Sequence, residues 1–171
     1  NADQTTRQGL ELSWQQTIWK QLNIQSSFSY IDAEFDSYTA EIANPDDSKK
    51  PYAKAINKGN KIPGIAKNQA FTRIAWQPER GSQAGLEARY MDKIYVDDIN
   101  SDTAPSYTVV AANVGYLWVN RDWKVNSYAR VDNLFDRNYV GSVIVNDGNS
   151  RFFEPVDGRN FSVGMSVTKA F

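Results

Sequence analysis

A run of lysines marks the part of the sequence best suited to bind an anion. Six lysines lie within residues 48–67 without an intervening acid: Lys49, Lys50, Lys54, Lys58, Lys61 and Lys67. Ammonium groups at this density attract anionic ligands, such as chelates with carboxylate or catecholate groups. We therefore expect Tyr52, Lys54 and Lys58 to contact such a ligand. Acidic residues at positions 36, 41, 46 and 47 precede the run, so a solvated, nearly neutral loop is the alternative.

Arg151 is the second candidate ligand contact. It follows Asn149 and Ser150 in a polar stretch and precedes Phe152. A guanidinium group forms two parallel hydrogen bonds to a carboxylate, which an ammonium group does not. The alternative is a salt bridge inside the same loop, to Glu154 or Asp157.

The composition excludes several classes of chemistry. The chain has 171 residues, no Cys and no His, and its 19 basic and 20 acidic residues leave a net charge of −1. Thiol nucleophiles, disulfides and cysteine zinc sites are therefore excluded, and the most common general base is missing. Near-neutral charge argues against a nucleic-acid partner. Phosphate loops and nucleophile elbows are also absent. We predict no enzyme activity, no cofactor and no resident metal.

One acidic segment resembles the start of a calcium loop. Residues 98–102 read D-I-N-S-D, but Thr103 replaces the required Gly and Val109 replaces the bidentate Glu. We interpret the segment as an acidic, solvated loop tip.

Alternation of apolar and polar residues dominates the chain and predicts β-strands. Seven segments show it, most of them 10 to 14 residues long: 10–18, 22–34, 66–77, 85–96, 107–119, 123–135 and 161–171. Strands of soluble domains usually have about five or six residues, whereas about 9–11 tilted residues cross a bilayer. The lengths therefore favour an all-β, antiparallel, up-and-down transmembrane barrel.

The connections between these segments alternate in length. Segments 18–21, 78–82 and 120–122 are short, whereas 36–65, 97–106 and 136–157 are long. In an up-and-down sheet all short turns then lie at one end, as in outer-membrane barrels with short periplasmic turns and long extracellular loops. All five tryptophans lie near short turns, which predicts an aromatic belt there: Trp14, Trp19, Trp76, Trp118 and Trp123.

Several motifs resemble one family. Residues 131–139, VDNLFDRNY, are similar to the NLFD-x-x-Y signature of TonB-dependent outer-membrane receptors. Residues 151–159, RFFEPVDGR, resemble the run into that family's last strand, and Phe171 resembles its aromatic terminus. Residues 9–11 and 28–33 resemble strand openings of the same family.

The resemblance implies a larger structure than 171 residues can build. Residues 1–171 would form the C-terminal part of a 22-stranded barrel, without the plug domain that the TonB system engages. The implied function is uptake of a ferric siderophore or similar iron chelate across the bacterial outer membrane, among lipid and lipopolysaccharide. Phe171 would be read by the barrel assembly machinery.

Other functions remain open. One alternative is TonB-dependent uptake of a non-iron ligand (PQQ, cobalamin or a glycan), since receptors for PQQ are also similar over residues 139–155. A soluble β-sheet binding module is a second alternative. Inward-facing charges of a large barrel would contact the plug first and a transported ligand second. These residues are Glu87, Arg89, Lys93, Lys124, Arg130 and Asp132.

Overall fold

Seven long strands form one antiparallel sheet. The computed structural model describes residues 4–42 and 52–169, and the side chains of residues 40–42 and 52–54 are not described. The strands run in chain order: β1 (Gln4–Ile18), β2 (Leu22–Ile42), β4 (Asn68–Trp76), β5 (Gly81–Met91), β8 (Tyr107–Asn120), β9 (Trp123–Asp132) and β12 (Asn160–Lys169). All neighbours pair antiparallel. The predicted seven-stranded up-and-down sheet is confirmed.

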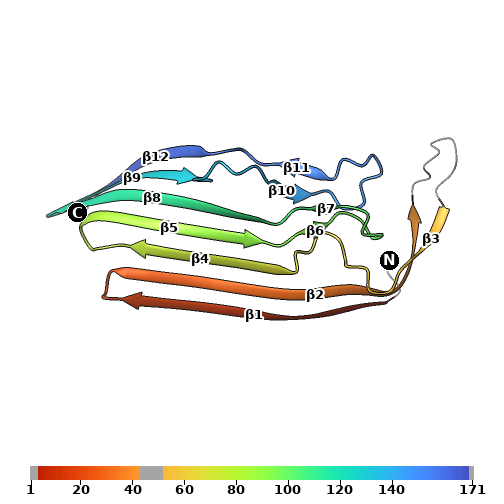
Figure 1. Cartoon of the computed structure of the whole chain (residues 1–171). Helices are drawn as coiled ribbons and strands as arrows, with labels where there is room; N and C mark the ends of the chain where they lie inside the picture. Colours follow the sequence, from red (N-terminus) through yellow and green to blue (C-terminus); the bar gives the residue numbers. More distant parts are fainter. Residues whose placement is uncertain (1–3, 43–51, 170–171) are drawn as a thin grey trace.

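The long loops carry short strands of their own. These are β3 (Tyr52–Ile56), β6 (Ile94–Tyr95), β7 (Thr103–Ala104), β10 (Val140–Val143) and β11 (Phe153–Pro155). Figure 1 shows them at one end of the sheet, with the short turns at the other end. Within the described ranges, no helix has the length and apolarity to cross a membrane.

Several predicted boundaries differ from the structure. The strand expected over 10–18 begins six residues earlier, at Gln4. The segment expected over 36–65 as a loop contains strand, because β2 continues to Ile42 and β3 pairs back onto it. The strand expected over 85–96 begins at Gly81 and ends at Met91. The strand expected to end at 135 ends at Asp132, because Asn133 adopts a φ of 50°. The predicted terminal residue Phe171 lies outside the described residues, as do Lys49 and Lys50.

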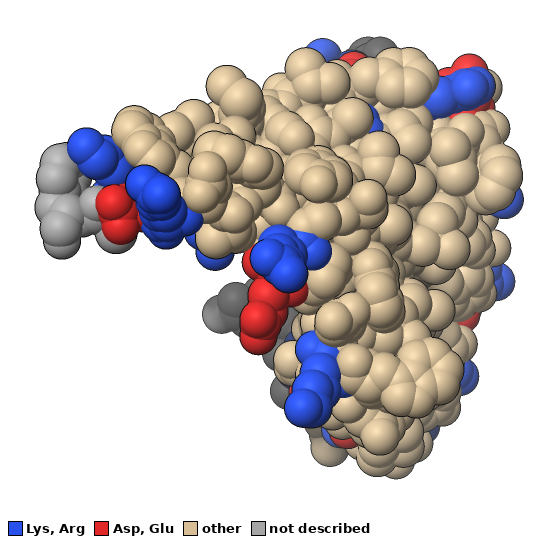
Figure 2. Space-filling model, turned by 90° about the vertical axis from the view of Figure 1, so that its left-hand side faces the viewer, with Lys and Arg blue, Asp and Glu red and all other residues tan. Residues whose placement is uncertain are grey.

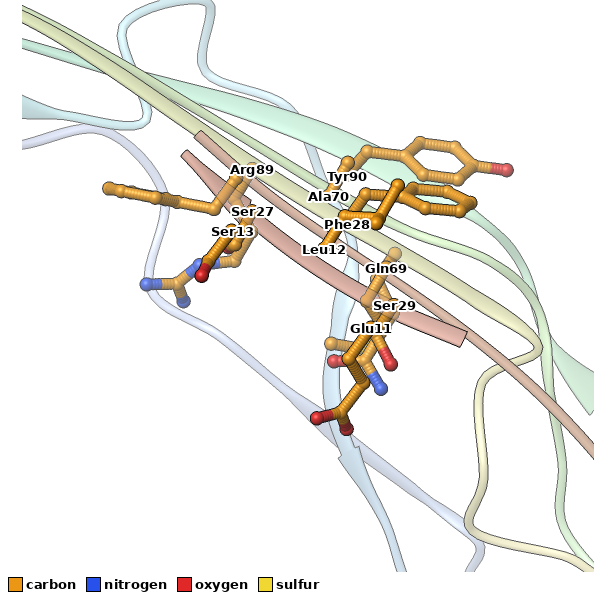
Figure 3. Close-up of a pocket in the computed structure, with 12 residues that line it drawn as sticks. Glu11, Leu12, Ser13, Ser27, Phe28, Ser29, Gln69, Ala70, Arg89 and Tyr90 are labelled. Carbon is orange, nitrogen blue, oxygen red and sulfur yellow. The ribbon is translucent and has the colours of Figure 1, made fainter. Parts of the chain in front are cut away.

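Strand register brings the apolar faces together. One cross-strand row of directly opposed residues runs through six strands: Ile24, Ile74, Leu86, Ala112, Val131 and Phe161. Opposed residues of a sheet share a face. Figure 3 shows Leu12 and Phe28 on one side of the strands and Ser13 and Ser27 on the other. The predicted period-two faces are therefore continuous across the sheet.

This apolar face is exposed. Phe161 is 75% exposed and Leu86 is 48% exposed. An exposed apolar surface of this extent requires a cover, and lipid chains are the cover that strands of this length fit. Viewed from the short turns, the sheet curves around a hollow, and most of the convex surface in view carries no charge (Figure 2). The buried cluster of Phe35 and Ile56 lies at the end of the sheet that carries the long loops, between β2 and β3.

The five tryptophans lie at the short-turn end, as predicted. Trp76 pairs with Leu22, Trp118 with Val125, and Trp123 with Asn120 at the turn itself. All five are exposed, from 40% for Trp76 to 81% for Trp19. Indole rings favour the headgroup level of a bilayer, so these side chains mark one edge of the apolar surface.

Candidate functional site

The polar face of the sheet carries a network of charges. Register places Arg73 of β4 directly opposite Glu87 of β5. Arg130 of β9 donates two hydrogen bonds to the Glu87 carboxylate, at 3.2 and 2.9 Å, and its Nε–H donates to Asp132 at 2.8 Å. The Nε of Arg73 lies 3.4 Å from Glu87. Two cations and two anions therefore neutralise one another across the wall.

Arg130 reaches Glu87 across β8 because Ala111 lies between them. Ala111 pairs with Glu87 and is 8% exposed. Its methyl group leaves room for the guanidinium to pass above the strand. The charged side chains of this network therefore come from the strands on either side of β8, and β8 itself contributes none.

A second cluster closes the base of the loop between β9 and β12. Asn133 is buried and has a left-handed backbone, which Asn tolerates better than most residues. Its carboxamide accepts from the Arg137 N–H at 2.8 Å and donates to the Arg137 carbonyl at 2.9 Å. The Arg159 N–H donates to Asp136 at 2.8 Å. A Cβ at Gly158 would lie 2.9 Å from the Asp136 carboxylate oxygen, so a larger residue there would have to displace that side chain.

These contacts explain two of the sequence motifs in structural terms. The NLFD-x-x-Y segment supplies Asn133, Asp136 and Tyr139, and the later GR pair supplies the backbone that Asp136 holds. Tyr139 packs on Tyr107 with ring centroids 4.3 Å apart. Both rings line a hollow of about 230 Å³ on the polar face, together with Arg89, Arg130 and Asp157.

Two asparagines tie the three long loops together. The Asn100 carboxamide accepts from the Lys61 N–H at 2.7 Å and donates to the Lys61 carbonyl at 2.8 Å. Asn146 accepts from the Asp98 N–H at 3.1 Å, and its own N–H donates to the Val96 carbonyl. Both asparagines have left-handed backbones, and Val96 is fully buried. The loops therefore form one connected assembly.

Lys61 also anchors the first long loop electrostatically. Its ammonium group bonds Asp32 at 2.7 Å and also bonds Glu34, while Lys67 lies 3.5 Å from Asp32. Asp32 lies beyond Tyr30, where the pairing of β2 with β4 ends, so it stands outside the spanning segment. The hydrogen bond from Lys61 lowers the pKa of Asp32. The hydrogen bonds to Asp32 and Glu34 raise the pKa of Lys61.

The predicted ligand contacts lie in this loop region, on separate segments. Lys58 is exposed and lies 3.7 Å from Asp36. Tyr52 and Lys54 lie on β3, opposite Ile42 and Ala40, and their side chains are outside the described set. Arg151 lies 3.8 Å from Asp147, so its partner is neither Glu154 nor Asp157. Among the side chains described, no ion pair or hydrogen bond joins Lys58 to Arg151.

The acidic segment 98–102 forms a turn that several hydrogen bonds hold in place. Asn100 binds the Lys61 backbone, and the Asp97 carboxylate accepts from the Ser101 N–H at 2.8 Å and from its hydroxyl. Over residues 4–39 and 55–169, no group of three acidic, His or Cys side chains is placed to hold a metal ion.

Sequence reasoning drew attention to these loops but did not predict that Asn100 and Asn146 join them. Asn100 stood in the calcium-like segment and Asn133 in the family motif, so each was noted for another reason. Asparagine between polar neighbours in a long loop is a weak signal for a left-handed position. The partner of Asn100, Lys61, lies 39 positions away and has no signal in the sequence.

The chain is similar to known proteins over most of its length. The family model described as TonB dependent receptor-like, beta-barrel matches residues 1–134. A probable TonB-dependent siderophore receptor, PiuA, of Acinetobacter baumannii is 27% identical over 139 residues, which are 81% of this chain and 18% of that protein. The ferrichrome outer membrane transporter/phage receptor of Escherichia coli is 30% identical over 139 residues, 78% of this chain and 16% of that protein.

Solved structures show the same arrangement of strands. The crystal structure of the siderophore receptor PiuA from Acinetobacter baumannii matches with a TM-score of 0.79 and 25% identity, over 97% of this chain and 22% of that one. The ferric citrate transporter FecA in its unliganded form matches with a TM-score of 0.73 over 97% of this chain and 24% of that one. At 18% identity the second likeness concerns the fold alone. The chain spans less than a quarter of each of these proteins.

Proposed function

The chain belongs to the TonB dependent receptor-like β-barrel family, and from that premise we propose that it supplies wall strands and outer loops to a receptor that imports a ferric siderophore. The observation that carries the proposal is the pair of contrasting faces. One face of seven strands is apolar and exposed, and the other holds the ion-paired network of Glu87 and Arg130. A barrel wall between lipid and a wet interior requires this contrast.

Membership in this family has direct consequences. The family consists of outer-membrane transport receptors rather than enzymes, so the chain is an outer-membrane protein of Gram-negative bacteria. The alternative of a soluble β-sheet module is thereby corrected. Alternation of apolar and polar residues did not separate the two classes, because soluble and membrane sheets share it.

Residues 1–171 form, in this proposal, the C-terminal part of a larger barrel whose plug lies elsewhere in the protein. The chain spans only 18% and 16% of the two relatives, which supports the proposal that the rest of the barrel and the plug lie elsewhere in the protein. The TonB system would act on that plug, so the strands described here would supply wall rather than energy coupling. Lipid, lipopolysaccharide and, through Phe171, the barrel assembly machinery are further partners under this proposal.

The ligand proposed is an anionic ferric chelate caught by the long loops. Relatives named as a siderophore receptor and a ferrichrome transporter support this class. The side chains of Lys58 and Arg151 are 79% and 76% exposed, and each has one carboxylate neighbour at 3.7–3.8 Å. Exposed ion pairs of this kind are weak, so carboxylate or catecholate groups of a ligand can replace the protein carboxylates. Tyr52 and Lys54 on β3 complete the proposed contact set.

Ligand titration of the full-length receptor in detergent tests the proposal. A panel of ferric siderophores, PQQ and cobalamin should yield tight binding of one ferric chelate. Arg151→Ala and Lys58→Ala should each weaken that binding several-fold, whereas Arg137→Ala, which removes another exposed cation, should not. Binding of PQQ or cobalamin instead would overturn the iron assignment. Indifference of ferric-chelate binding to both variants would overturn the contact residues alone.

A further inference from the structure

The turn between β1 and β2 has an unfavourable backbone for its residues. Trp19 and Lys20 have φ values of 51° and 60°, and the Gln21 N–H donates to the Ile18 carbonyl at 3.4 Å. Residues 19–21 connect the paired Ile18 and Leu22, and two consecutive positive φ values in such a turn favour Asn and Gly, because other side chains crowd the backbone there. Trp19 is nevertheless present and is 81% exposed. From a strained backbone at this exposed turn we infer that the side chains of Trp19 and Lys20 are themselves required.

The other short turns also present cations. Arg80 follows β4, and Arg121, with a φ of 47°, forms the turn after β8. Over the described residues at this end, five cations face two acids, so the net charge is 5 − 2 = +3: Lys20, Arg80, Arg121, Lys124 and Lys169 against Glu79 and Asp122. Lys169 lies over the Trp123 ring at 5.4 Å. Since the whole chain has a net charge of −1, the remainder of the chain is net negative. The excess of positive charge is therefore confined to the short-turn end.

Two neighbouring turns enclose an open hollow of about 520 Å³. Its lining residues are Lys20 and Gln21 of one turn, Pro78, Glu79 and Arg80 of the other, and Trp76 at the end of β4. Among the residues the structure describes, neither Lys20 nor Arg80 has a carboxylate partner. The hollow thus offers two unpaired cations beside an indole that borders the apolar face.

We propose that the short-turn end of this wall is a binding surface for anionic phospholipid, with the lipid phosphate held between Lys20 and Arg80. The indoles of Trp19 and Trp76 would lie at the glycerol level, and the acyl chains would continue over the apolar face below them. The argument for lipid rather than a protein partner is continuity. The cations border the same exposed tryptophans that mark the edge of the lipid-facing surface. This inference rests on the proposed function in one respect, since it takes the apolar face to be in a bilayer.

Native mass spectrometry of the full-length receptor tests the inference. The receptor, purified in detergent, is mixed with equal amounts of phosphatidylglycerol and phosphatidylcholine, and retained lipids are counted. We expect preferential retention of phosphatidylglycerol. Because a basic residue near an anionic lipid surface contributes about a five-fold effect, the variant Lys20→Gln with Arg80→Gln and Arg121→Gln should reduce the preference at least ten-fold. The matched control, Arg7→Gln with Lys93→Gln and Arg137→Gln at the loop end, should keep it.

A second variant separates lipid binding from turn stability. Trp19→Asn with Lys20→Gly installs residues that tolerate positive φ at both positions, so the hairpin should fold at least as well. Retention of phosphatidylglycerol should nevertheless fall several-fold. Equal retention of both lipids by the unaltered receptor, or an undiminished preference in both turn variants, would overturn the inference. A receptor that binds its ferric chelate but shows no lipid preference would leave the proposed function intact, whereas failure to bind any ferric chelate would count against that function alone.

Discussion

Arg130 holds Glu87 through two hydrogen bonds that pass over an intervening strand, at 3.2 and 2.9 Å. Such a link ties β5 to β9 without a backbone contact between them. The strand between them places the small side chain of Ala111 directly opposite Glu87, whereas Asn113 is directly opposite Arg130. The ion pair between Arg130 and Glu87 therefore depends on the small size of Ala111 as well as on the two charged groups.

Ala111→Leu should disrupt this link. The added side chain would occupy the path of the guanidinium, and overpacking of a filled site costs about 1–3 kcal/mol. Urea unfolding of the full-length receptor in detergent would measure the loss. Ala112→Leu, on the lipid-facing side of the same strand, is the control and should leave stability unchanged. Equal effects of the two substitutions would show that Ala111 is not required for passage of Arg130.

Asn133→Ala should open the base of the loop between β9 and β12. The substitution removes both bonds to the Arg137 backbone and places a residue with no αL preference at a φ of 50°. Buried polar groups left without partners cost about 1–3 kcal/mol. Limited trypsin digestion after Arg137 and Arg151 should become faster. Asn133→Asp keeps the acceptor and should give an intermediate rate, and an unaltered rate in Asn133→Ala would contradict the assignment.

Gly164→Ala should displace the Tyr128 ring. A Cβ at Gly164 would lie 2.6 Å from the nearest ring atom, closer than packing permits. We expect a loss of about 1–3 kcal/mol in unfolding free energy. Adding Tyr128→Ser to the same receptor should reduce the penalty of Gly164→Ala, because the clashing ring is gone. A penalty of the same size in the Tyr128→Ser background would rule out this contact as its cause.

The ion group of Asp32, Glu34 and Lys61 should limit the pH range over which the first long loop stays ordered. Since the pKa of Asp32 is lowered, its stabilisation is present above the ordinary value of 3.8 and is lost as pH falls through the lower folded value. Since the pKa of Lys61 is raised, its stabilisation is present below 10.5 and is lost as pH rises through the higher folded value.

Hydrogen exchange of residues 57–67 would measure this window. Protection, corrected for the intrinsic pH dependence of exchange, should be constant from about pH 4 to about pH 10 and should fall outside that range. Lys61→Gln should lower protection at neutral pH and flatten the profile. An identical profile in the substituted receptor would show that other contacts, such as those of Asn100, order the loop.

The sequence predicted the sheet well because each of the seven long strands contains a periodic segment. The row from Ile24 to Phe161 follows from six independent alternation patterns, and the register only brings them together. The loops were predicted less well. The continuation of β2 to Ile42 depends on pairing with β3, and the bonds of Asn100 join residues 39 positions apart. Such contacts depend on the folded arrangement and have no local pattern.

The same limit applies to the proposed ligand site. The lysine run and Arg151 were visible as residue types, but the partner of Arg151 was expected among residues that follow it. Its carboxylate neighbour is Asp147, four residues earlier, whose carboxylate also accepts from the Arg151 N–H at 2.7 Å. The turn therefore places the acidic partner before the arginine. A list of the charged residues near Arg151 in the sequence does not show which of them the turn brings into contact.

Uptake of iron by living cells tests the central claim most directly. The full-length receptor would be expressed in the outer membrane of cells that lack other siderophore receptors, and accumulation of radioactive iron would be followed with each ferric siderophore in turn. The account predicts accumulation with one chelate, dependent on an energised inner membrane and weakened by Arg151→Ala with Lys58→Ala but not by Arg137→Ala. A receptor that reaches the outer membrane folded and accumulates iron with none of the chelates would contradict it.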